Sequence, residues 1–274
     1  MEIKASDVAK LRQMTGSGMM DCKNALVEAN GDFDRAQEII REKGKLVASK
    51  RADRETKEGA VIAKISADAA KGILVCLGCE TDFVSKTEEF QALAKKVADA
   101  ALANLPADTE ALLNLKVDGA TIAELISQQT GKTGEKHQVA CYDKLEGALL
   151  TCYNHMNGKV SSLVAFSKAL LADAAKYIAM QTAAMSPVSV SKDDCPKEVQ
   201  ERELRIGREQ AKLDGKPEAM IEKIAQGKLS RFFKDSTLLA QDFINDSKIT
   251  VEAYLKSVDK DVTVTSFKRF SLND

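Results

Sequence analysis

Apolar residues recur at helical spacing in three short segments at the start of the chain, and a glycine follows each segment. Asp32 stands where it can cap the third segment. The segments are residues 8–14, 19–30 and 33–43, and the glycines expected to end them are Gly16, Gly31 and Gly44. Their apolar positions suffice for a small core, so the pattern predicts a three-helix domain over residues 1–54.

A charged segment over residues 49–58 separates this domain from two strand-like runs. The runs, residues 60–66 and 72–78, are apolar and flank a polar turn, as in a hairpin. A long amphipathic helix is expected next, with Ser85 and Glu88 as a capping box at its start. One face of this helix is apolar, so the hairpin is its expected packing partner.

The same order of strand, strand and helix returns over residues 148–157, 159–167 and 174–184. This repetition predicts an internal duplication. The second copy is shorter, mainly between its second strand and its helix, where the first copy has residues 79–90. Extra length at one place in one copy is where function is commonly added, so the loop CETDFVSKTEEF is the first candidate for a functional site.

A charged segment at about residues 192–235 follows the second copy and consists mainly of good helix formers. Residues 214–217 supply a turn, so an antiparallel helical hairpin is expected to project as an arm. Val199, Ile206 and Leu213 recur every seven residues and predict the seam between its two helices. The complementary positions are partly charged, so the seam is thin.

Together these elements predict an α+β protein with three parts. The three-helix domain is expected over residues 1–54, a first core subdomain with the candidate loop over residues 55–140, and a second core subdomain, including the arm, over residues 141–274. A helix over residues 250–258 and a strand over residues 261–271 are expected to return the chain to the core.

Charge is balanced along the chain, with 40 Lys and Arg against 41 Asp and Glu. The net charge of −1 gives no general attraction to nucleic acid or to an anionic membrane. No apolar run is long enough to cross a bilayer, and the first residues lack the apolar core of a signal peptide. We therefore expect a cytoplasmic protein with no direct nucleic-acid partner and no membrane partner.

The six cysteines of the chain are too sparse for a disulfide scaffold and fit a reducing compartment. Cys76 and Cys79 form a C-x-x-C, but they lie in a predicted strand, where residues three apart point to opposite faces. They are predicted to be ordinary buried thiols. With His137 and His155 as the only histidines, no metal site and no cofactor are expected.

Two short motifs invite a nucleotide-binding interpretation and fail it. Gly131, Lys132 and Thr133 match the end of a phosphate loop, but the position five residues before Gly131 holds Ile126 instead of glycine. The run at residues 15–18 lacks the spacing and the preceding strand of a dinucleotide site. Both motifs are predicted to be helix-ending turns. Because no nucleophile elbow or catalytic carboxylate pair accompanies them, the protein is not expected to be an enzyme.

The candidate loop contains Thr81, Asp82, Phe83 and Val84. Spacing alone predicts that Asp82 accepts backbone hydrogen bonds in the turn. It also predicts that Phe83 and Val84 pack beneath the helix, because an aromatic residue at the start of a helix usually belongs to the core.

Met19 and Met20 are adjacent on a predicted helix, so they cannot both face the same core. One of them is therefore expected to be exposed, and an exposed flexible methionine suits contact with a partner. Single exposed apolar residues are also common on protein surfaces, so exposure alone does not mark a site.

Two segments give the chain a family resemblance. Residues 11–44 (LRQMTGSGMMDCKNALVEANGDFDRAQEIIREKG) closely resemble the amino-terminal signature of the elongation factor Ts family, and residues 79–84 (CETDFV) resemble its second signature. The resemblance continues through YIAMQTAAMSP and GKPEAMIEKIAQGKL and covers nearly the whole chain. It implies a ubiquitin-associated-like three-helix domain, a core of two duplicated α+β subdomains, and a helical hairpin that forms a coiled-coil arm.

The resemblance also implies a function. Members of the family are guanine nucleotide exchange factors of translation elongation, so the expected partner is the GTPase elongation factor Tu in its GDP-bound and nucleotide-free forms. The matching positions Thr81, Asp82, Phe83 and Val84 would enter that partner. There Phe83 would disturb the magnesium and phosphate site, GDP would leave, and the factor would stay bound until GTP rebinds.

Further partner contacts implied by the resemblance lie in the amino-terminal domain, at Arg12, Met19 and Met20. His155 matches a partner-facing histidine of the second copy, although Met156 and Asn157 change the turn around it. Any apolar strip on the arm favours self-association, so a homodimer or a 2:2 assembly with the partner is an open alternative.

Two other classes of protein stay open from the sequence. In one, the three-helix domain recognises ubiquitin-like or nascent chains and the rest of the chain is a scaffold. In the other, suggested only by the Gly-Lys-Thr run and the glycine-rich turns, the chain is an enzyme that uses a nucleotide. Selective capture of a GTPase separates the first from an exchange factor, and direct nucleotide binding by the isolated chain separates the second.

Overall fold

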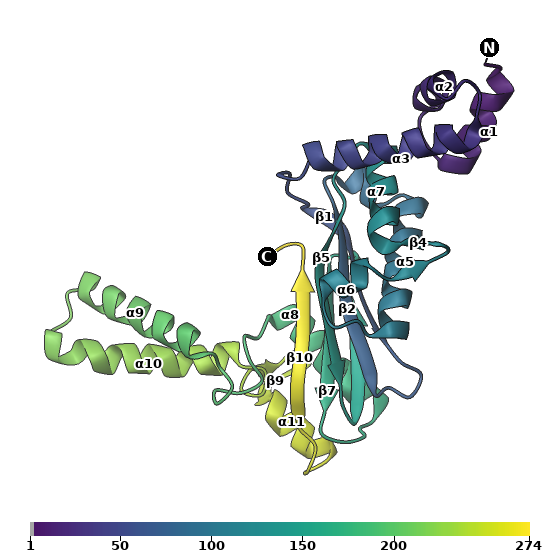
Figure 1. Cartoon of the computed structure of the whole chain (residues 1–274). Helices are drawn as coiled ribbons and strands as arrows, with labels where there is room; N and C mark the ends of the chain where they lie inside the picture. The colour runs from purple at the N-terminus through teal and green to yellow at the C-terminus, as the bar shows by residue number, and fades with distance from the viewer. Residues whose placement is uncertain (1–2) are drawn as a thin grey trace.

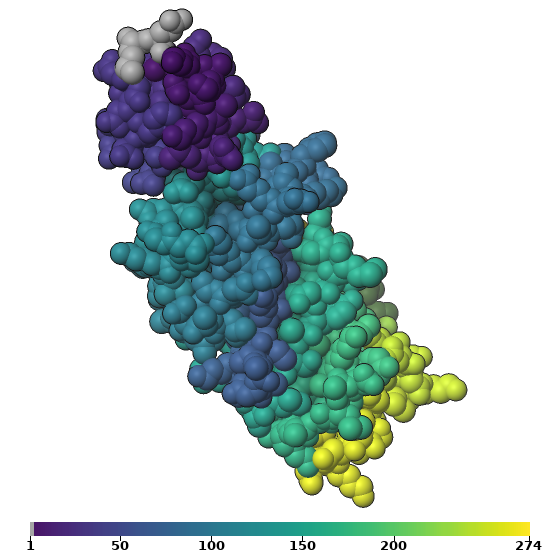
Figure 2. All heavy atoms as spheres, turned by 90° about the vertical axis from the view of Figure 1, so that its right-hand side faces the viewer, coloured from purple at the N-terminus to yellow at the C-terminus, as the bar shows by residue number. Residues whose placement is uncertain are grey.

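The computed structural model describes residues 3–274, and Met1 and Glu2 of the expected amino-terminal domain lie outside the described residues. Helices and small antiparallel sheets combine in it, which confirms the α+β prediction. Figure 1 shows a three-helix bundle at the amino terminus, a core built on two sheets, and a projecting helical hairpin. Figure 2 shows the bundle as a lobe at one end of an elongated body.

The amino-terminal bundle forms where the apolar spacing predicted it. Its helices are α1 (Ala5–Thr15), α2 (Met19–Glu28) and α3 (Phe33–Lys50). Its buried core consists of Val8, Leu11, Cys22, Ala25, Leu26, Ala29 and Ala36. Asp32 caps α3 as expected, because its carboxylate accepts a hydrogen bond from the Arg35 N–H at 3.0 Å. Gly16 takes a left-handed conformation and ends α1.

Gly44 does not end the third helix, contrary to the expectation from the sequence. α3 continues through it to Lys50, and Gly44 is buried where α3 crosses α7 (Ile122–Thr133). A methyl group added to Gly131 of α7 would lie 2.9 Å from the Cα of Gly44. Because neither Gly44 nor Gly131 has a side chain, the backbones of α3 and α7 can approach closely. Gly44 is therefore needed for helix packing and does not mark a helix end. Figure 1 shows α3 lying across α7, which joins the bundle to the core.

Two three-stranded antiparallel sheets form the core. Each contains a hairpin and a later strand that pairs with the second strand of that hairpin. The first sheet has the order β1-β2-β5, with β1 (Glu58–Ile65), β2 (Lys71–Cys79) and β5 (Gln138–Glu146). The second has the order β10-β7-β6, with β6 (Leu149–Asn154), β7 (Val160–Phe166) and β10 (Val264–Ser271). Both predicted hairpins and their repetition are confirmed.

The two sheets face each other, and one long helix covers the outer face of each. α5 (Glu88–Asn104) buries Phe90 against the first sheet, and α8 (Ala172–Met185) buries Ile178 against the second. Between the sheets, Cys76 of β2 lies in a cluster that includes Phe270 of β10. β2 is thus buried on both faces, which explains its uninterrupted apolar sequence.

The long helix of the first copy begins later than its expected capping box. Ser85 ends a separate single turn, α4 (Asp82–Ser85), and its hydroxyl donates to a carbonyl of that turn at 3.2 Å. Thr87 caps α5 instead, by accepting the Phe90 N–H at 3.3 Å. The extra turn accounts for the greater length of this connection relative to residues 167–171 of the second copy.

Several elements were not predicted. The short ones are α6 (Thr109–Leu113), β3 (Lys116–Val117), β4 (Ala120–Thr121), β8 (Asp242–Phe243) and β9 (Asp246–Thr250). Only the end of α7, which begins with a capping box of Thr121 and Glu124, was expected from the sequence, and β5 was missed. The expected subdomain boundary at residue 140 falls inside β5, which pairs with β2 along its length. The last helix, α11 (Val251–Val258), confirms its prediction.

The helical hairpin predicted at about residues 192–235 is present, but its predicted seam is wrong. Its helices are α9 (Lys197–Leu213) and α10 (Glu218–Ser236). Leu213 is 87% exposed, and Ile206 is exposed as well. The helices instead meet closely where Gly207 of α9 lies against Ala225 of α10, and Ile221 and Leu229 of α10 are buried on either side. Because small side chains allow close backbone approach, no seven-residue apolar repeat is needed here.

Candidate partner-binding loop

The connection between β2 and α5 carries the residues singled out from the sequence. Thr81 caps the turn α4, and its hydroxyl accepts the Val84 N–H at 3.4 Å. Val84 is half-buried and packs on the core, as its spacing predicted. Phe83 is instead 83% exposed, so the expectation that it packs beneath the helix is wrong. Adjacent residues of a single helical turn point in different directions, and here only Val84 faces the core.

A carboxylate from a distant segment holds the base of this loop. Glu135 accepts the Thr81 N–H at 3.1 Å with one oxygen and the Thr81 hydroxyl at 2.6 Å with the other. Glu135 lies between α7 and β5, 54 residues from Thr81 along the chain. Its carbonyl lies 2.9 Å from Nδ1 of the buried His137. Because a carbonyl can only accept, that ring nitrogen carries the proton.

A second carboxylate, Glu80, ties the loop to the segment that leaves the amino-terminal bundle. Arg51 Nη1 lies 2.8 and 3.0 Å from its two oxygens, and the Lys136 N–H donates to it at 2.7 Å. Burial alone would raise the pKa of Glu80, but the Lys136 hydrogen bond and Arg51 outweigh it and hold the pKa below its ordinary value. The Lys136 ammonium donates to the carbonyls of Ala52 and Arg54 at 2.6 and 2.8 Å.

Asp82 lies at the surface beside Phe83. It pairs with Lys86, one turn further on, at 2.6 Å, and the side chains of Lys86 and Asp82 are 74% and 45% exposed. The hydrogen bond from Lys86, and then its charge, lower the pKa of Asp82. Exposed pairs of this kind contribute little to stability, so Asp82 is available for contact with a partner.

The turn between β6 and β7 lies beside the same loop. The Val61 N–H donates to the carbonyl of Gly158 at 2.8 Å, and Lys159 pairs with Glu58 at 2.7 Å. Glu58 stands opposite Cys79 in the register of β1 and β2, directly before the loop. The second copy therefore presents its first hairpin turn at the end of the molecule that carries the loop.

His155 lies in this turn and is exposed, with Nδ1 hydrogen-bonded to the Tyr153 hydroxyl at 3.0 Å. Met156 is 97% exposed at the tip. The structure thus brings His155 to the same end of the molecule as residues 81–84, although the two segments are far apart in the sequence.

Arg12, Met19 and Met20 lie on the amino-terminal bundle, and all three are exposed. Met19 is 44% exposed and Met20 is 64% exposed, so the expectation that at least one of them is exposed is confirmed, and in fact both are. The reason is that both belong to the first turn of α2, whose buried residues begin at Cys22.

The carboxyl-terminal end of α7 connects this surface with the loop. Gly16, in the turn before α2, lies against the Lys132 side chain. A methyl group added to Gly16 would lie 2.6 Å from the Cε of Lys132. Lys132 pairs in turn with Glu89 of the first turn of α5 at 2.5 Å. Glu135 follows the same helix and holds the loop. The bundle and the loop therefore share one support.

The two cysteines of the C-x-x-C are buried on opposite faces of β2. Cys76 lies between the sheets, whereas Cys79 lies under α5. Burial raises the pKa of each thiol to about 12, and nearby acidic groups add to the effect at Cys79. Both are protonated at neutral pH, as expected for ordinary buried thiols. Within residues 3–274, no cluster of three or more His, Cys, Asp or Glu side chains is placed to hold a metal ion.

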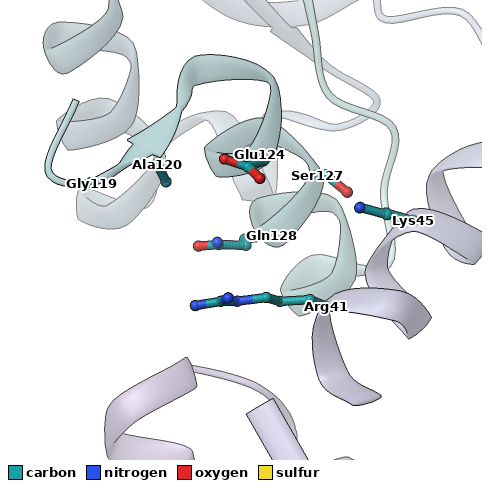
Figure 3. Close-up of a pocket in the computed structure, with 7 residues that line it drawn as sticks. All are labelled: Arg41, Lys45, Gly119, Ala120, Glu124, Ser127 and Gln128. Atoms are coloured by element: carbon teal, nitrogen blue, oxygen red, sulfur yellow. The ribbon is translucent and has the colours of Figure 1, made fainter. Parts of the chain in front are cut away.

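The hollow drawn in Figure 3 is a gap in the interface between α3 and α7. Arg41 and Lys45 extend from α3 toward Glu124, Ser127 and Gln128 of α7. Hydrogen bonds at the helix cap lower the pKa of Glu124, and the charges of Lys45 and Arg41 add to this. The hollow has a volume of about 130 Å³, which is smaller than the roughly 300 Å³ of the smallest typical small-molecule sites. The hollow belongs to the joint between bundle and core.

The Gly-Lys-Thr run does not form a phosphate loop. Gly131, Lys132 and Thr133 form the last turn of α7, and the left-handed Gly134 ends the helix. The N–H groups of a last helical turn are bonded within the helix and are not available to a phosphate. The interpretation of this run, and of the run at residues 15–18, as helix-ending turns is confirmed.

None of the helices described between residues 3 and 274 has both the length and the apolar character needed to cross a bilayer. Fold and site together define an α+β protein with two related sheets and an exposed aromatic residue on a hydrogen-bonded loop, a combination that suits contact with another protein.

The family model described as "Elongation factor TS" matches residues 80–274. The chain is 47% identical to the elongation factor Ts of Flavobacterium psychrophilum over 272 residues, which cover 98% of each chain. It is 46% identical to that of Porphyromonas gingivalis over 275 residues, which cover 100% of this chain and 99% of the relative. The chain therefore belongs to the elongation factor Ts family, and this membership implies a role as a nucleotide exchange factor in translation elongation.

Sequence reasoning missed the residues that support the loop, namely Arg51, Glu80, Glu135 and Lys136. All four are charged, and only Arg51 lies in a segment that was read as a linker. Glu80 lies inside the second signature, directly before Thr81, and was a usable signal, but its partners Arg51 and Lys136 lie 29 and 56 residues away. No local pattern identifies such pairs.

Proposed function

We propose that this chain binds the GTPase elongation factor Tu, both with GDP and without nucleotide, and accelerates the release of GDP. Phe83 inserts beside the magnesium and phosphate site of the partner and breaks the metal bridge to GDP. The factor then stays bound until GTP rebinds. The single observation that carries the proposal is the 83% exposure of Phe83 on a loop whose base is held by hydrogen bonds.

An exposed phenyl group leaves interaction free energy available for a partner. Complete burial of such a side chain contributes about 1.5–3 kcal/mol. Because Glu135 and Thr81 already order the loop, little conformational entropy is lost when a partner buries Phe83. A rigid aromatic group of this kind can occupy space that the partner otherwise gives to groups around the metal ion.

Several separate contacts are needed to offset the disturbance of the metal site. Thr81 and Val84 keep the shape of the loop, and Asp82 contacts the amino terminus of a partner helix, where a carboxylate is favoured. His155, at the same end of the molecule, adds a contact from the second copy. The contacts from the amino-terminal bundle are Arg12, Met19 and Met20.

Thermodynamic linkage constrains the mechanism. If the factor weakens GDP binding by some ratio, GDP weakens binding of the factor by the same ratio. Exchange therefore passes through a ternary complex that either ligand can leave. The factor changes which nucleotide is bound and makes or breaks no covalent bond, so no catalytic residue is assigned.

The architecture proposed for this function divides the chain into residues 1–54, 55–140 and 141–274, and residues 141–146 of the last part complete the first sheet as the end of β5. The first is a ubiquitin-associated-like domain, and the arm at about residues 192–235 acts as a coiled coil. The exposed Leu213 at the end of α9 favours a homodimer or a 2:2 assembly through this arm.

Release of fluorescent GDP from elongation factor Tu tests the proposal. Catalytic amounts of the wild-type chain, with unlabelled nucleotide in excess, should give rapid release. Phe83→Ala should retain much of the binding but slow release at least about tenfold, because the missing contact acts when the metal site is disturbed. Leu171→Ala is the matched control, because Leu171 is 71% exposed in the corresponding connection of the second copy.

If Phe83→Ala released GDP at the wild-type rate, the exchange function would stand, but the disturbance of the metal site would have to come from contacts other than Phe83. Release by neither protein would contradict the function itself. Slowing by Leu171→Ala to the same degree would show that any exposed apolar group contributes equally.

A further inference from the structure

The connection between α7 and β5 is itself rigid and is directed at the loop. Gly134 ends α7 in a left-handed conformation with φ 71°. The Glu135 N–H donates to the Thr133 hydroxyl at 3.1 Å, and its carbonyl accepts from His137 Nδ1 at 2.9 Å. His137 is only 6% exposed. Both backbone groups of Glu135 are therefore fixed, and so is the origin of its side chain.

The carboxylate of Glu135 is hydrogen-bonded to Thr81, two residues before Phe83. Its two oxygens accept the N–H and the hydroxyl of Thr81 at 3.1 and 2.6 Å, so Thr81 can neither rotate nor shift independently. Charge-assisted bonds of this type are stronger than neutral ones. Thr81 caps α4, and Phe83 is the second residue of that turn. The backbone of residues 81–83 is thus connected through Thr81 to the fixed Glu135.

We propose that Glu135 is a positioning residue for nucleotide exchange, which holds Thr81 and thereby orients Phe83 toward the partner. The inference rests on the proposed function, since it assigns a role in that reaction to a residue outside the family signatures. Glu135 acts through Phe83. Its removal leaves the phenyl group in place but lets the loop adopt other conformations.

The second copy supplies a matched control for this contact. Asp259, in the segment before β10, pairs with Lys168 in the connection between β7 and α8 at 2.8 Å. Asp259 therefore holds the second connection from the same place in the topology from which Glu135 holds the first. No phenylalanine lies in the connection that Asp259 supports, residues 167–171.

The first experiment separates rate from affinity. GDP release from elongation factor Tu is measured against factor concentration for the wild type, Glu135→Ala, Glu135→Gln and Asp259→Ala. Glu135→Ala should lower the maximal release rate about tenfold, with less than about a twofold change in the half-saturating concentration. Glu135→Gln should recover most of the rate, because an amide can still accept from one Thr81 donor. Asp259→Ala should match the wild type.

A maximal rate unchanged in Glu135→Ala would overturn the proposal. So would a loss confined to the half-saturating concentration, which would make Glu135 a direct partner contact. Circular dichroism and the unfolding midpoint of each variant show whether it is folded. If Glu135→Ala does not fold, the rate of Glu135→Gln decides: a small but measurable loss with unchanged half-saturation supports the proposal, and no loss overturns it.

A double-mutant cycle tests whether Glu135 acts through Phe83. Adding Glu135→Ala to Phe83→Ala should slow release by less than about twofold, because the group to be positioned is already missing. A further tenfold loss in this background would overturn the positioning role.

An independent readout keeps this inference separable from the proposed function. The chain contains no tryptophan, so Phe83→Trp introduces the sole indole at the tip of the loop. Glu135→Ala in that background should accelerate the local decay of fluorescence anisotropy, whereas Asp259→Ala should not. An unchanged decay overturns the inference. Faster local decay together with a normal GDP release rate for Phe83→Ala supports the ordering of the loop by Glu135 and overturns instead the role of Phe83 in exchange.

Discussion

In each copy of the repeat, an acidic residue that lies before the third strand of the sheet contacts the connection between the second strand and the long helix. The two connections expose different side chains. In the first copy, Glu135 lies just before β5 and holds Thr81. In the second, Asp259 lies shortly before β10 and holds Lys168. The position of the support is therefore common to both copies, although its chemistry differs.

What differs is the connection that is supported. The first copy inserts the turn α4 and exposes Phe83, whereas the second runs directly from β7 into α8 with Leu171 at the surface. The comparison teaches that the two copies place a support at the same position of the fold, and that the inserted turn α4 presents an aromatic group at the surface of only one of them.

The largest expected difference between the copies concerns the glycine near the start of each hairpin, Gly59 at the second position of β1 and Gly147 two residues before β6. Gly59 has φ 155°, and a methyl group there would lie 2.2 Å from the Leu77 carbonyl oxygen. At Gly147 the nearest atoms would be at 3.4 Å. Gly59→Ala should lower the free energy of unfolding by about 3 kcal/mol or more, and Gly147→Ala by less than about 1 kcal/mol. Urea unfolding measures both, and equal losses would refute the difference.

The next effect tests whether the inserted turn, and not merely an aromatic group, matters. Phe83→Ala should lose about 2 kcal/mol of transition-state stabilisation, which equals roughly thirtyfold in the GDP release rate. Adding Leu171→Phe should not restore the rate, because the second connection lacks α4. Stopped-flow release measures the double variant, and recovery would show that the two connections are interchangeable.

A smaller effect concerns the ion pairs behind the two connections. The side chains of Arg51 and Glu80 are 35% and 16% exposed, against 40% and 36% for Lys168 and Asp259. Arg51→Ala leaves the shielded Glu80 without its cation and should lower the free energy of unfolding by about 1 kcal/mol. Lys168→Ala should leave the thermal midpoint unchanged within error. Calorimetry measures the thermal midpoint of both variants. A larger drop for Lys168→Ala than for Arg51→Ala would contradict the expected difference.

The smallest effect is the pH dependence that Glu80 contributes. Its folded pKa lies below the ordinary value of 4.5, so its stabilisation is complete above about pH 4.5 and is lost as the pH falls through the folded pKa. Glu80→Gln should therefore flatten the decline of stability in acid, by less than about 1 kcal/mol. Unfolding midpoints at pH 3 to 7 measure this change. A steeper decline in the variant would contradict the sign.

Local periodicity explains which parts of the fold were predictable. The hairpins were found because β2 is buried on both faces and reads as one apolar run. The loop was found because a repeat made its extra length visible. β5 escaped because most of its residues are half-buried and give neither an alternating nor a continuous pattern.

Contacts between distant segments explain the errors. Gly44 looks like a helix end in the sequence, and only the presence of Gly131 on α7 shows that it is a crossing point. Phe83 has the spacing of a core residue, and its exposure follows from the turn that Glu135 and Thr81 fix. Sequence neighbours carry no information about either arrangement.

The crossing of α3 and α7 at Gly44 and Gly131 has a consequence for association with a partner. Because α3 runs without a break from the bundle to Lys50, the bundle and the loop are held in one fixed arrangement. Under the proposed function, docking of the bundle places Phe83 near its target at a high effective concentration, and the second contact forms without a separate encounter. A flexible joint at Gly44 would lose this avidity while leaving each individual contact intact.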